Sequence, residues 1–292
     1  MRWQDGRRSS NIDDRRGSPG RRAGVALGGG GAVVVLVIAV VMMLLGEDPS
    51  ALLEAAGSSG TSVGDVAATG GTIAASPEEE RAADFVAVVL ADTEDTWSRY
   101  FQQNGSGTYP APTLVLFRES VDSACGFQSS AVGPFYCPAD RKVYLDLAFF
   151  GELERLGAPG DFAQAYVIGH EIGHHLQTVL GISQQLAQQK RGLPEPQRNT
   201  LSVRQELQAD CFSGVWAHHA HAQRQILESG DVEEGLAAAA SIGDDTLQRR
   251  AGGRLTPESW THGSSEQRVR WFRVGFQTGD LRACDTYSPP TP

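Results

Sequence analysis

His170-Glu171-Ile172-Gly173-His174 is the stretch from which the rest of this chain is best interpreted, because it reads H-E-x-x-H. In an α-helix of about 3.6 residues per turn, histidines four positions apart share one face, where both imidazoles reach a single metal ion. Neutral imidazole nitrogens suit Zn²⁺, and Glu171 can take a proton from a metal-bound water. The motif therefore predicts a hydrolytic zinc site of the type used by peptidases.

The residues around the motif predict a helix. Pro159-Gly160 forms a turn, Asp161 with Gln164 gives a variant of the capping box, and Gly181 gives a stop signal. The apolar positions between these signals have helical spacing: Phe162, Ala165, Tyr166, Ile168, Ile172, Leu176 and Val179. Gly173 costs such a helix about 1 kcal/mol relative to alanine, which indicates that another segment packs closely there.

A mononuclear catalytic zinc needs a third protein ligand, and the best-placed candidate is Glu206. Ser202 and Gln205 predict the start of a second helix, on which Glu206 and Asp210 lie one turn apart on the same face. Glu206 can then ligate, while Asp210 accepts a hydrogen bond from the outer nitrogen of a ligating histidine. The alternative is a surface helix with two solvated carboxylates.

The two motifs, His170 to Gln177 and Glu206 to Phe212, resemble those of a bacterial family of neutral zinc metallopeptidases. The resemblance extends to both ends of the chain: Met1-Arg2-Trp3, Asn11 to Gly17, Gly133 to Pro138, Thr261-His262-Gly263 and Glu266-Gln267-Arg268. More distantly, the layout is similar to that of gluzincin peptidases, which implies that Glu206 is the third zinc ligand. The resemblance implies an α+β, zincin-like domain with a small antiparallel sheet and two active-site helices.

The expected site holds one Zn²⁺ per chain on His170, His174 and Glu206, with water in the fourth position and Glu171 as general base. His175 is expected outside the coordination sphere, because its side chain points about 100° away from that of His174. The resemblance suggests that the block around His262 borders the site. His262 or Arg268 could then stabilise the oxyanion, although a capping histidine and a structural arginine are alternatives.

Composition limits the possible partners. The chain has 292 residues, 40% of them hydrophobic, and a formal charge of -10, which argues against a nucleic-acid partner. Residues 1–46 carry seven arginines and three aspartates, a charge of +4, which leaves -14 for the remainder. The acidic remainder is predicted to be the enzyme, and its expected partner is a peptide or protein substrate.

The N-terminal quarter predicts attachment to a membrane. Residues 1–22 are Arg-rich and are expected to form a disordered cytoplasmic tail. Residues 23–46 are uncharged and long enough to span a bilayer as a signal anchor, the alternatives being a buried core helix or a cleaved signal peptide. Residues 47–75, rich in Gly, Ala, Ser and Thr, are expected to form a flexible linker. The positive-inside rule then places residues 76–292 outside the cytoplasm.

All four cysteines follow the apolar segment, in agreement with an oxidising compartment. Of the three possible pairings, we favour Cys125 with Cys137, which closes a local loop and leaves Cys211 with Cys284. The alternative is that Cys211 is a zinc ligand or a buried free thiol.

The predicted domain starts at Ser76-Pro77, which caps a helix that runs to about Gln103. The strands predicted next are residues 113–117, 133–137 and 142–147, and Val143 to Asp146 is the candidate edge strand beside the substrate. An ordinary interior strand is the alternative for that segment.

The C-terminal half contains a predicted loop and a further predicted helix. Residues 184–199 are expected to form an exposed loop, and residues 233–250 a helix. His218, His219 and His221 are expected to lie at a solvated helix end rather than in a second metal site.

The sequence thus predicts a membrane-anchored zinc endopeptidase. The main alternative is a non-catalytic, zinc-containing binding or scaffold protein of the cell envelope. A structural zinc site is usually closed by four protein ligands, whereas three ligands with an intact base favour catalysis. A zinc hydrolase that acts on other bonds is a third possibility.

Overall fold

The computed structural model describes residues 1–17, 74–105 and 107–288, and residues 1–17 belong to the same compact unit as the C-terminal part. The predicted membrane anchor (23–46) and nearly all of the predicted linker (47–75) lie outside the described residues. Among the residues that are described, no helix is long and apolar enough to cross a bilayer.

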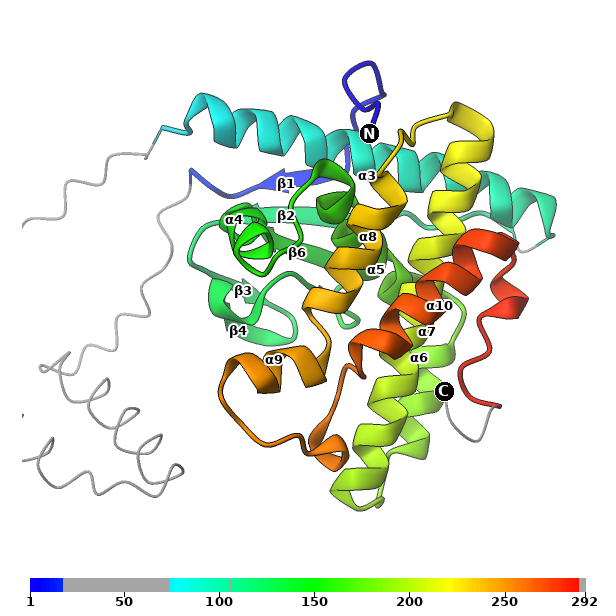
Figure 1. Ribbon diagram of the computed structural model, residues 1–292. Helices are drawn as coiled ribbons and strands as arrows, with labels where there is room; N and C mark the ends of the chain where they lie inside the picture. The colour runs from blue at the N-terminus through cyan, green and yellow to red at the C-terminus, as the bar shows by residue number, and fades with distance from the viewer. Residues whose placement is uncertain (18–73, 106, 289–292) are drawn as a thin grey trace, which may run out of the picture. The chain divides into compact units, whose positions relative to one another are not determined.

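Helix α3 (Pro77–Gln103) begins where the sequence predicts. The side chain of Ser76 accepts a hydrogen bond from the backbone N–H of Glu79, and Pro77 occupies the first turn, where its missing N–H has no cost. Helix α3 lies along the sheet in Figure 1, and its buried apolar residues belong to the same core cluster as those of β2 and β6.

The main sheet is mixed, with strand order β1-β2-β6-β5. Its strands are β1 (Ile12–Asp14), β2 (Thr113–Phe117), β6 (Lys142–Asp146) and β5 (Phe135–Cys137). The pairs β1–β2 and β2–β6 are parallel, and only β5 is antiparallel to its neighbour. A separate antiparallel hairpin consists of β3 (Ser120–Ser123) and β4 (Gly126–Ser129).

Two strand predictions are therefore wrong. The sheet is not simply antiparallel. The chain passes through β3, β4 and β5 before it forms β6, and β6 then pairs with β2 in parallel. The segment Val143 to Asp146 is an interior strand rather than an edge, since β2 and β5 pair with its two sides. The edge strand on this side of the sheet is β5.

Residues 1–17 are not a disordered tail. Strand β1 lies beside β2 (Figure 1). Trp3 is buried against Phe85 of α3, with their ring centroids 5.3 Å apart. The Ser9 hydroxyl and the Asn11 amide both donate hydrogen bonds to Glu94 of α3. The Arg-rich composition suggested disorder, but these arginines form ion pairs with carboxylates of the domain, such as Arg7 with Glu94.

This packing also bears on the predicted membrane topology. One membrane crossing by residues 23–46 would place β1 and β2 on opposite sides, where the two strands could not pair. A single crossing with a cytoplasmic tail and an extracytoplasmic domain does not agree with this pairing, and the single-pass topology is not confirmed. A membrane contact through residues 23–46 stays a prediction, and it requires that both flanking segments lie on the same side.

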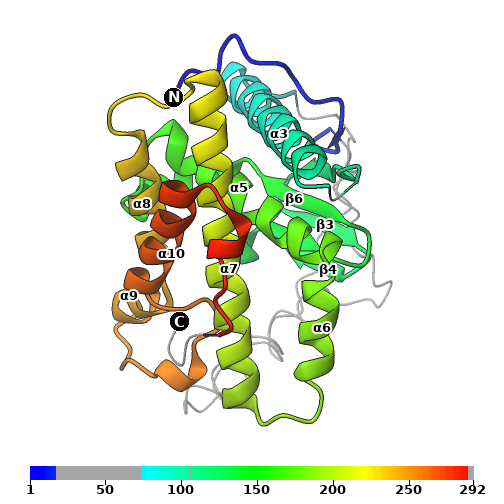
Figure 2. The ribbon, with the colours of Figure 1, turned by 90° about the vertical axis from the view of Figure 1, so that its right-hand side faces the viewer.

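Helices form the other part of the molecule. They are α4 (Ala148–Arg155), α5 (Asp161–Val179), α6 (Ile182–Gln189), α7 (Glu195–Arg224), α8 (Asp231–Ser241), α9 (Asp244–Arg250) and α10 (Ser265–Thr278). Short 3₁₀ turns occur at η1 (Ser130–Val132), η2 (Pro257–Ser259) and η3 (Leu281–Ala283). Figure 2 shows that α10 lies along α7, the central helix of this part of the molecule.

Several predicted helix boundaries need correction. Gly160 rather than Asp161 occupies the cap position of α5. Helix α7 begins at Glu195, so Ser202 lies inside the helix and caps nothing, and its hydroxyl instead donates to the Arg198 carbonyl. Much of the predicted loop 184–199 is helical in α6 and α7, and the predicted helix 233–250 is divided at Gly243 into α8 and α9.

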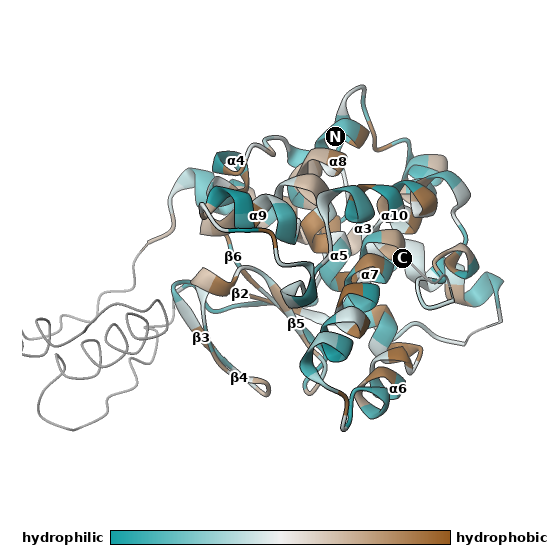
Figure 3. Ribbon diagram, turned by 60° about the horizontal axis from the view of Figure 1, so that its bottom comes forward, coloured by the Kyte–Doolittle hydropathy of each residue, from teal (hydrophilic) through white to brown (hydrophobic). Residues whose placement is uncertain are grey.

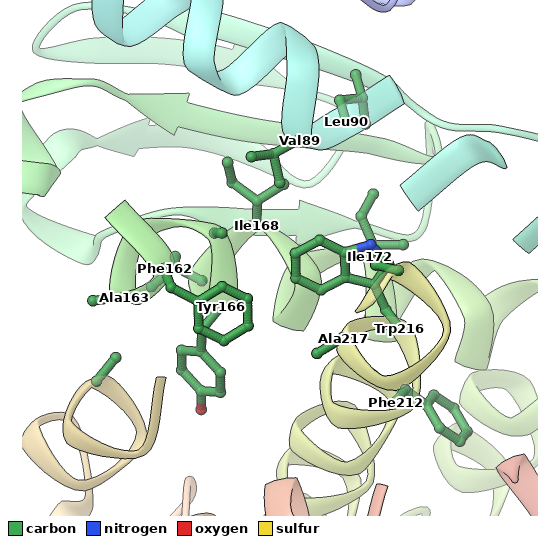
Figure 4. Packing of buried hydrophobic residues seen from close by; sticks show 14 of the residues in the cluster. Val89, Leu90, Phe162, Ala163, Tyr166, Ile168, Ile172, Phe212, Trp216 and Ala217 are labelled. Carbon is green, nitrogen blue, oxygen red and sulfur yellow. The ribbon is translucent and has the colours of Figure 1, made fainter. Parts of the chain in front are cut away.

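The main core joins α3, α5 and α7. Ile168 of α5 points toward Val89 of α3, as Figure 4 shows. Phe162 of α5 stacks on Trp216 of α7 with ring centroids 6.1 Å apart. Burial of such side chains contributes roughly 1.5–3 kcal/mol each. Helix α5, which carries the H-E-x-x-H motif, thus packs against α3 and against α7.

Both predicted disulfides are present. Cys125–Cys137 ties the β3–β4 hairpin to β5, and Cys211–Cys284 ties α7 to the C-terminal segment. The alternative in which Cys211 is a zinc ligand or a free thiol is therefore excluded.

At Gly173, α5 passes close to the backbone of α7, as the glycine in the helix indicated. A Cβ atom at this position would lie 2.8 Å from the carbonyl oxygen of Ala209. We expect Gly173→Ala to lower the free energy of unfolding by about 1–3 kcal/mol, because the two helices must separate. Chemical denaturation measures the effect. Gly151→Ala in α4, where no atom lies within 4 Å, is the control and should be neutral or stabilising.

Candidate active site

Helices α5 and α7 bring His170, His174 and Glu206 together. The Nε2 atom of His170 lies 3.1 Å from Glu206 Oε2, and Nε2 of His174 lies 3.4 Å from Glu206 Oε1. One potential ligand atom from each of the three residues falls within 4.8 Å of the others. This spacing allows all three to coordinate one ion.

The outer nitrogens of both histidines have hydrogen-bond partners. His170 Nδ1 donates to Asp210 Oδ1 at 2.8 Å, and His174 Nδ1 donates to Gln177 Oε1 at 3.0 Å. These bonds keep each Nδ1 as the donor, so that Nε2 is the nitrogen that binds a metal when the ion displaces its proton. Asp210 was expected in this role from the sequence, whereas Gln177 was not. Gln177 lies three residues after His174 on the same helix face, and this spacing is the sequence signal that could have identified it as the partner of His174.

Asp210 belongs to a fully buried ionic network. Arg268 of α10 binds it with two nitrogens, Nε to Oδ2 and Nη2 to Oδ1, each at 2.9 Å. The Tyr166 hydroxyl donates to the same carboxylate and accepts from Arg268. Burial alone would raise the pKa of Asp210, but Arg268 and His170 lower it to about 2. Arg268 therefore holds Asp210, which argues against the predicted direct role at an oxyanion.

The electrostatics of the ligand cluster suit a cation. Burial alone would lower the pKa of His170, but the charge of Asp210 and hydrogen bonds to Asp210 and Glu206 raise it to about 10. The pKa of Glu206 is held well below its usual value, since the nearby histidines outweigh the effect of burial. The protein therefore stabilises positive charge between these three side chains, as the donor set of a Zn²⁺ site requires.

A cavity of about 840 Å³ opens onto this cluster. Glu171, only 7% exposed, lines it together with His170, His174 and Glu206. The β3–β4 hairpin and β5 contribute to one wall, and α6 contributes to the other. Figure 3 shows the hairpin and α6 on opposite sides of β5 and α7. A cavity of this volume is in the range of ligand-binding sites.

His262 lines the same cavity from the segment before α10. Its Nδ1 lies 3.3 Å from Asp244 Oδ1, and Asp244 Oδ2 accepts the backbone N–H groups of Thr261, His262 and Gly263. The hydrogen bond to Asp244 raises the pKa of His262 despite partial burial. Asp244 thus orients the imidazole, a role that sequence reasoning did not assign.

Of the four remaining histidines, His175, His218 and His219 have structural hydrogen bonds. His175 bonds to the Tyr136 hydroxyl and the Pro110 carbonyl, away from the ligand cluster as predicted. His218 and His219 bond to backbone carbonyls of Phe276 and Gly279. In the described part of the chain, the second group of potential ligands is Asp161, Asp231 and Glu234, and the Met1 amino group lies 2.6 Å from Asp161.

A buried H-E-x-x-H helix, a carboxylate from a second helix and a cavity beside them define a metallopeptidase type of site. The chain belongs to the family described as Putative neutral zinc metallopeptidase, whose model matches residues 1–287. The match includes the N-terminal segment that contributes β1, in agreement with its place in the domain.

Relatives cover the chain to different extents. The uncharacterized protein YpfJ of Escherichia coli strain K12 is 45% identical over 288 residues, which are 98% of this chain and 99% of that protein. The uncharacterized protein Rv2575 of Mycobacterium tuberculosis strain H37Rv is 46% identical over 194 residues, 62% of this chain and 64% of that protein. No solved structure matches the chain.

Proposed function

We propose that this protein is a zinc-dependent endopeptidase that binds one Zn²⁺ through His170, His174 and Glu206. The single observation that carries the proposal is the convergence of three ligand atoms within 4.8 Å beside a cavity that Glu171 also lines. Hydrogen bonds to Asp210 and Gln177 prepare both imidazoles for ligation.

Bound Zn²⁺ would lower the pKa of a water toward 7 and polarise the substrate carbonyl. Glu171 accepts the proton of the attacking water and then passes it to the leaving amine, so that no covalent intermediate forms. His262, oriented by Asp244, donates a hydrogen bond to the carbonyl oxygen as negative charge develops there. Asp210, held by Arg268, keeps His170 in position.

Strand β5 is the proposed substrate-binding edge, in place of Val143 to Asp146. It is an edge of the sheet, and Phe135 and Tyr136 line the cavity. An extended peptide could add to this edge through main-chain hydrogen bonds. Such pairing binds many sequences, which suits an endopeptidase.

The main alternative is less well supported. A non-catalytic binding or scaffold protein has no need of a carboxylate at position 171 beside three prepared ligands. The two disulfides favour an oxidising, extracytoplasmic compartment for either function.

The test of the proposal is cleavage of a mixed peptide library by the purified full chain, monitored by mass spectrometry. We expect cuts within peptides that cease when a chelator is added and resume when one equivalent of Zn²⁺ is restored. Cleavage that persists in excess chelator would contradict the metal mechanism. Zinc binding without any cleavage would favour the binding protein.

The proposed role of His262 predicts a pH effect. The Asp244 carboxylate raises the pKa of His262, so the protonated imidazole persists to higher pH than it would alone. Asp244→Asn keeps the backbone hydrogen bonds but removes the charge, so the pKa of His262 falls. The alkaline limb of the kcat/KM profile should therefore move to lower pH. An unchanged profile would show that His262 does not assist the reaction.

A further inference from the structure

Lys190 is an unusual group in the active-site cavity. It follows α6, lines the cavity and is partly buried. Its Nζ donates to Ser202 Oγ at 2.8 Å and to Gln205 Oε1 at 3.5 Å, both neutral groups on α7. Among the described residues, no carboxylate lies within ion-pairing distance of Nζ, although partly buried cations are usually paired.

Arg268, the lining arginine, is already neutralised. It is 2% exposed, and both nitrogens that face Asp210 bind its carboxylate. Of the lysine and arginine side chains that line the cavity, Lys190 is therefore the one that remains available for a ligand. An ammonium with three donors and two neutral partners has one N–H to offer, which a carboxylate accepts most strongly.

The position of Lys190 fixes where such a carboxylate would lie. Its two partners precede Glu206 on α7 by four residues and by one residue. One helical turn is about 5.4 Å, and an extended peptide advances about 3.3 Å per residue. A substrate carboxylate on Lys190 would thus lie within roughly two residues of the bond that is cut.

Charge in the metal-bound site favours the same ligand. Three carboxylates line the cavity: Glu152, which is paired with Arg155, and Glu171 and Glu206, whose charges the two charges of Zn²⁺ would offset. Lys190 then leaves one net positive charge at this end of the cavity. Water is partly excluded there, so the attraction for an anion is stronger than on the surface.

We propose that Lys190 is a specificity-determining residue that binds a carboxylate of the peptide substrate close to the scissile bond. For a cut inside a chain the carboxylate belongs to an Asp or Glu side chain, and for a cut next to the end of the peptide it belongs to the C-terminus. This inference rests on the proposed peptidase function, and it names the substrate class of that site.

The test uses binding, so that it does not depend on turnover. The full chain carrying Glu171→Gln is loaded with zinc and titrated calorimetrically with acetylated octapeptides of otherwise neutral sequence. Each peptide has Glu or Gln at one scanned position and ends in a free carboxylate or an amide. We expect carboxylate peptides of one class to bind roughly ten- to a hundredfold more tightly than their neutral partners. The class that gains affinity identifies the source of the carboxylate.

Matched variants then assign the effect to Lys190. Lys190→Met, which keeps the side-chain length, should abolish the preference, and Lys190→Glu should replace it with a preference for Lys peptides. Lys142→Met changes the only other lysine of the chain, which lies on β6 near Asp13, and should keep the preference. Equal binding of charged and neutral peptides, or a preference that survives Lys190→Met, would overturn the inference. An unchanged circular dichroism spectrum and zinc content of each variant exclude misfolding.

Cleavage by the chain with intact Glu171 separates this inference from the proposed function. If neutral and acidic peptides are cut equally well, the peptidase function stands and the role of Lys190 fails. If nothing is cut but carboxylate binding depends on Lys190, the hydrolytic function fails and the carboxylate site stands.

Discussion

Replacement of Glu171 by glutamine should leave zinc bound and reduce the kcat for peptide hydrolysis by roughly 10²–10⁴-fold. This range is what a positioned general base usually contributes to a reaction. The amide has nearly the shape of the carboxylate but cannot accept a proton from the attacking water. Glu171 is not among the three proposed ligands, so the metal content should stay at the wild-type level. Stopped assays on any peptide from the library, with zinc measured in parallel, give both quantities.

Glu152→Gln is the matched control for this prediction. Glu152 lines the same cavity but is exposed and lies 3.7 Å from Arg155 in an ion pair. The control should cleave at nearly the wild-type rate. Wild-type turnover by Glu171→Gln would show that another group takes the proton and that the proposed mechanism is wrong.

Replacement of Arg268 by methionine should have the largest effect on stability. Arg268 and Asp210 are 2% and 0% exposed, so loss of the guanidinium leaves a carboxylate buried without its counter-ion. Breaking a buried pair in this way costs about 3–5 kcal/mol. Zinc affinity should fall as well, because Asp210 is the partner that holds His170 Nδ1. Denaturant titration of the apo and zinc-loaded protein measures both effects.

Two further variants test the reason for that loss. The double variant Arg268→Met with Asp210→Asn removes the unpaired charge and should recover part of the lost stability, so the two changes are not additive. Arg273→Met, at an exposed position of the same helix, should change the free energy of unfolding by less than about 0.5 kcal/mol. If Arg268→Met is equally mild, the network does not stabilise the fold.

Local signals in the sequence predicted much of the site. Helical spacing placed His170 and His174 on one face, and the interval between Glu206 and Asp210 placed both carboxylates toward them. These predictions needed only the geometry of two helices and one contact between them. Gly173 even marked where the helices touch, since a side chain there would meet the backbone of Ala209.

Features that depend on contacts distant in sequence were not predictable in the same way. Strand β1 pairs with a strand about a hundred residues later, and nothing in Ile12–Asp14 specifies a parallel partner. The roles of Arg268 and Asp244 follow from the docking of α10 and α9, which no spacing within one helix reveals. The start of α7 was missed because its first turns are polar and contain Pro196, which is acceptable only near a helix N-terminus.

The measurement that tests the central claim most directly is the metal content of the purified full chain, determined by mass spectrometry beside two variants. The account predicts one zinc per chain in the wild type and in Glu195→Ala, which changes an exposed residue at the start of α7. Glu206→Ala should lose most of the metal, because only the two histidines remain as ligands. Failure of the wild type to bind zinc after reconstitution, or full zinc occupancy in Glu206→Ala, would contradict the site built on His170, His174 and Glu206.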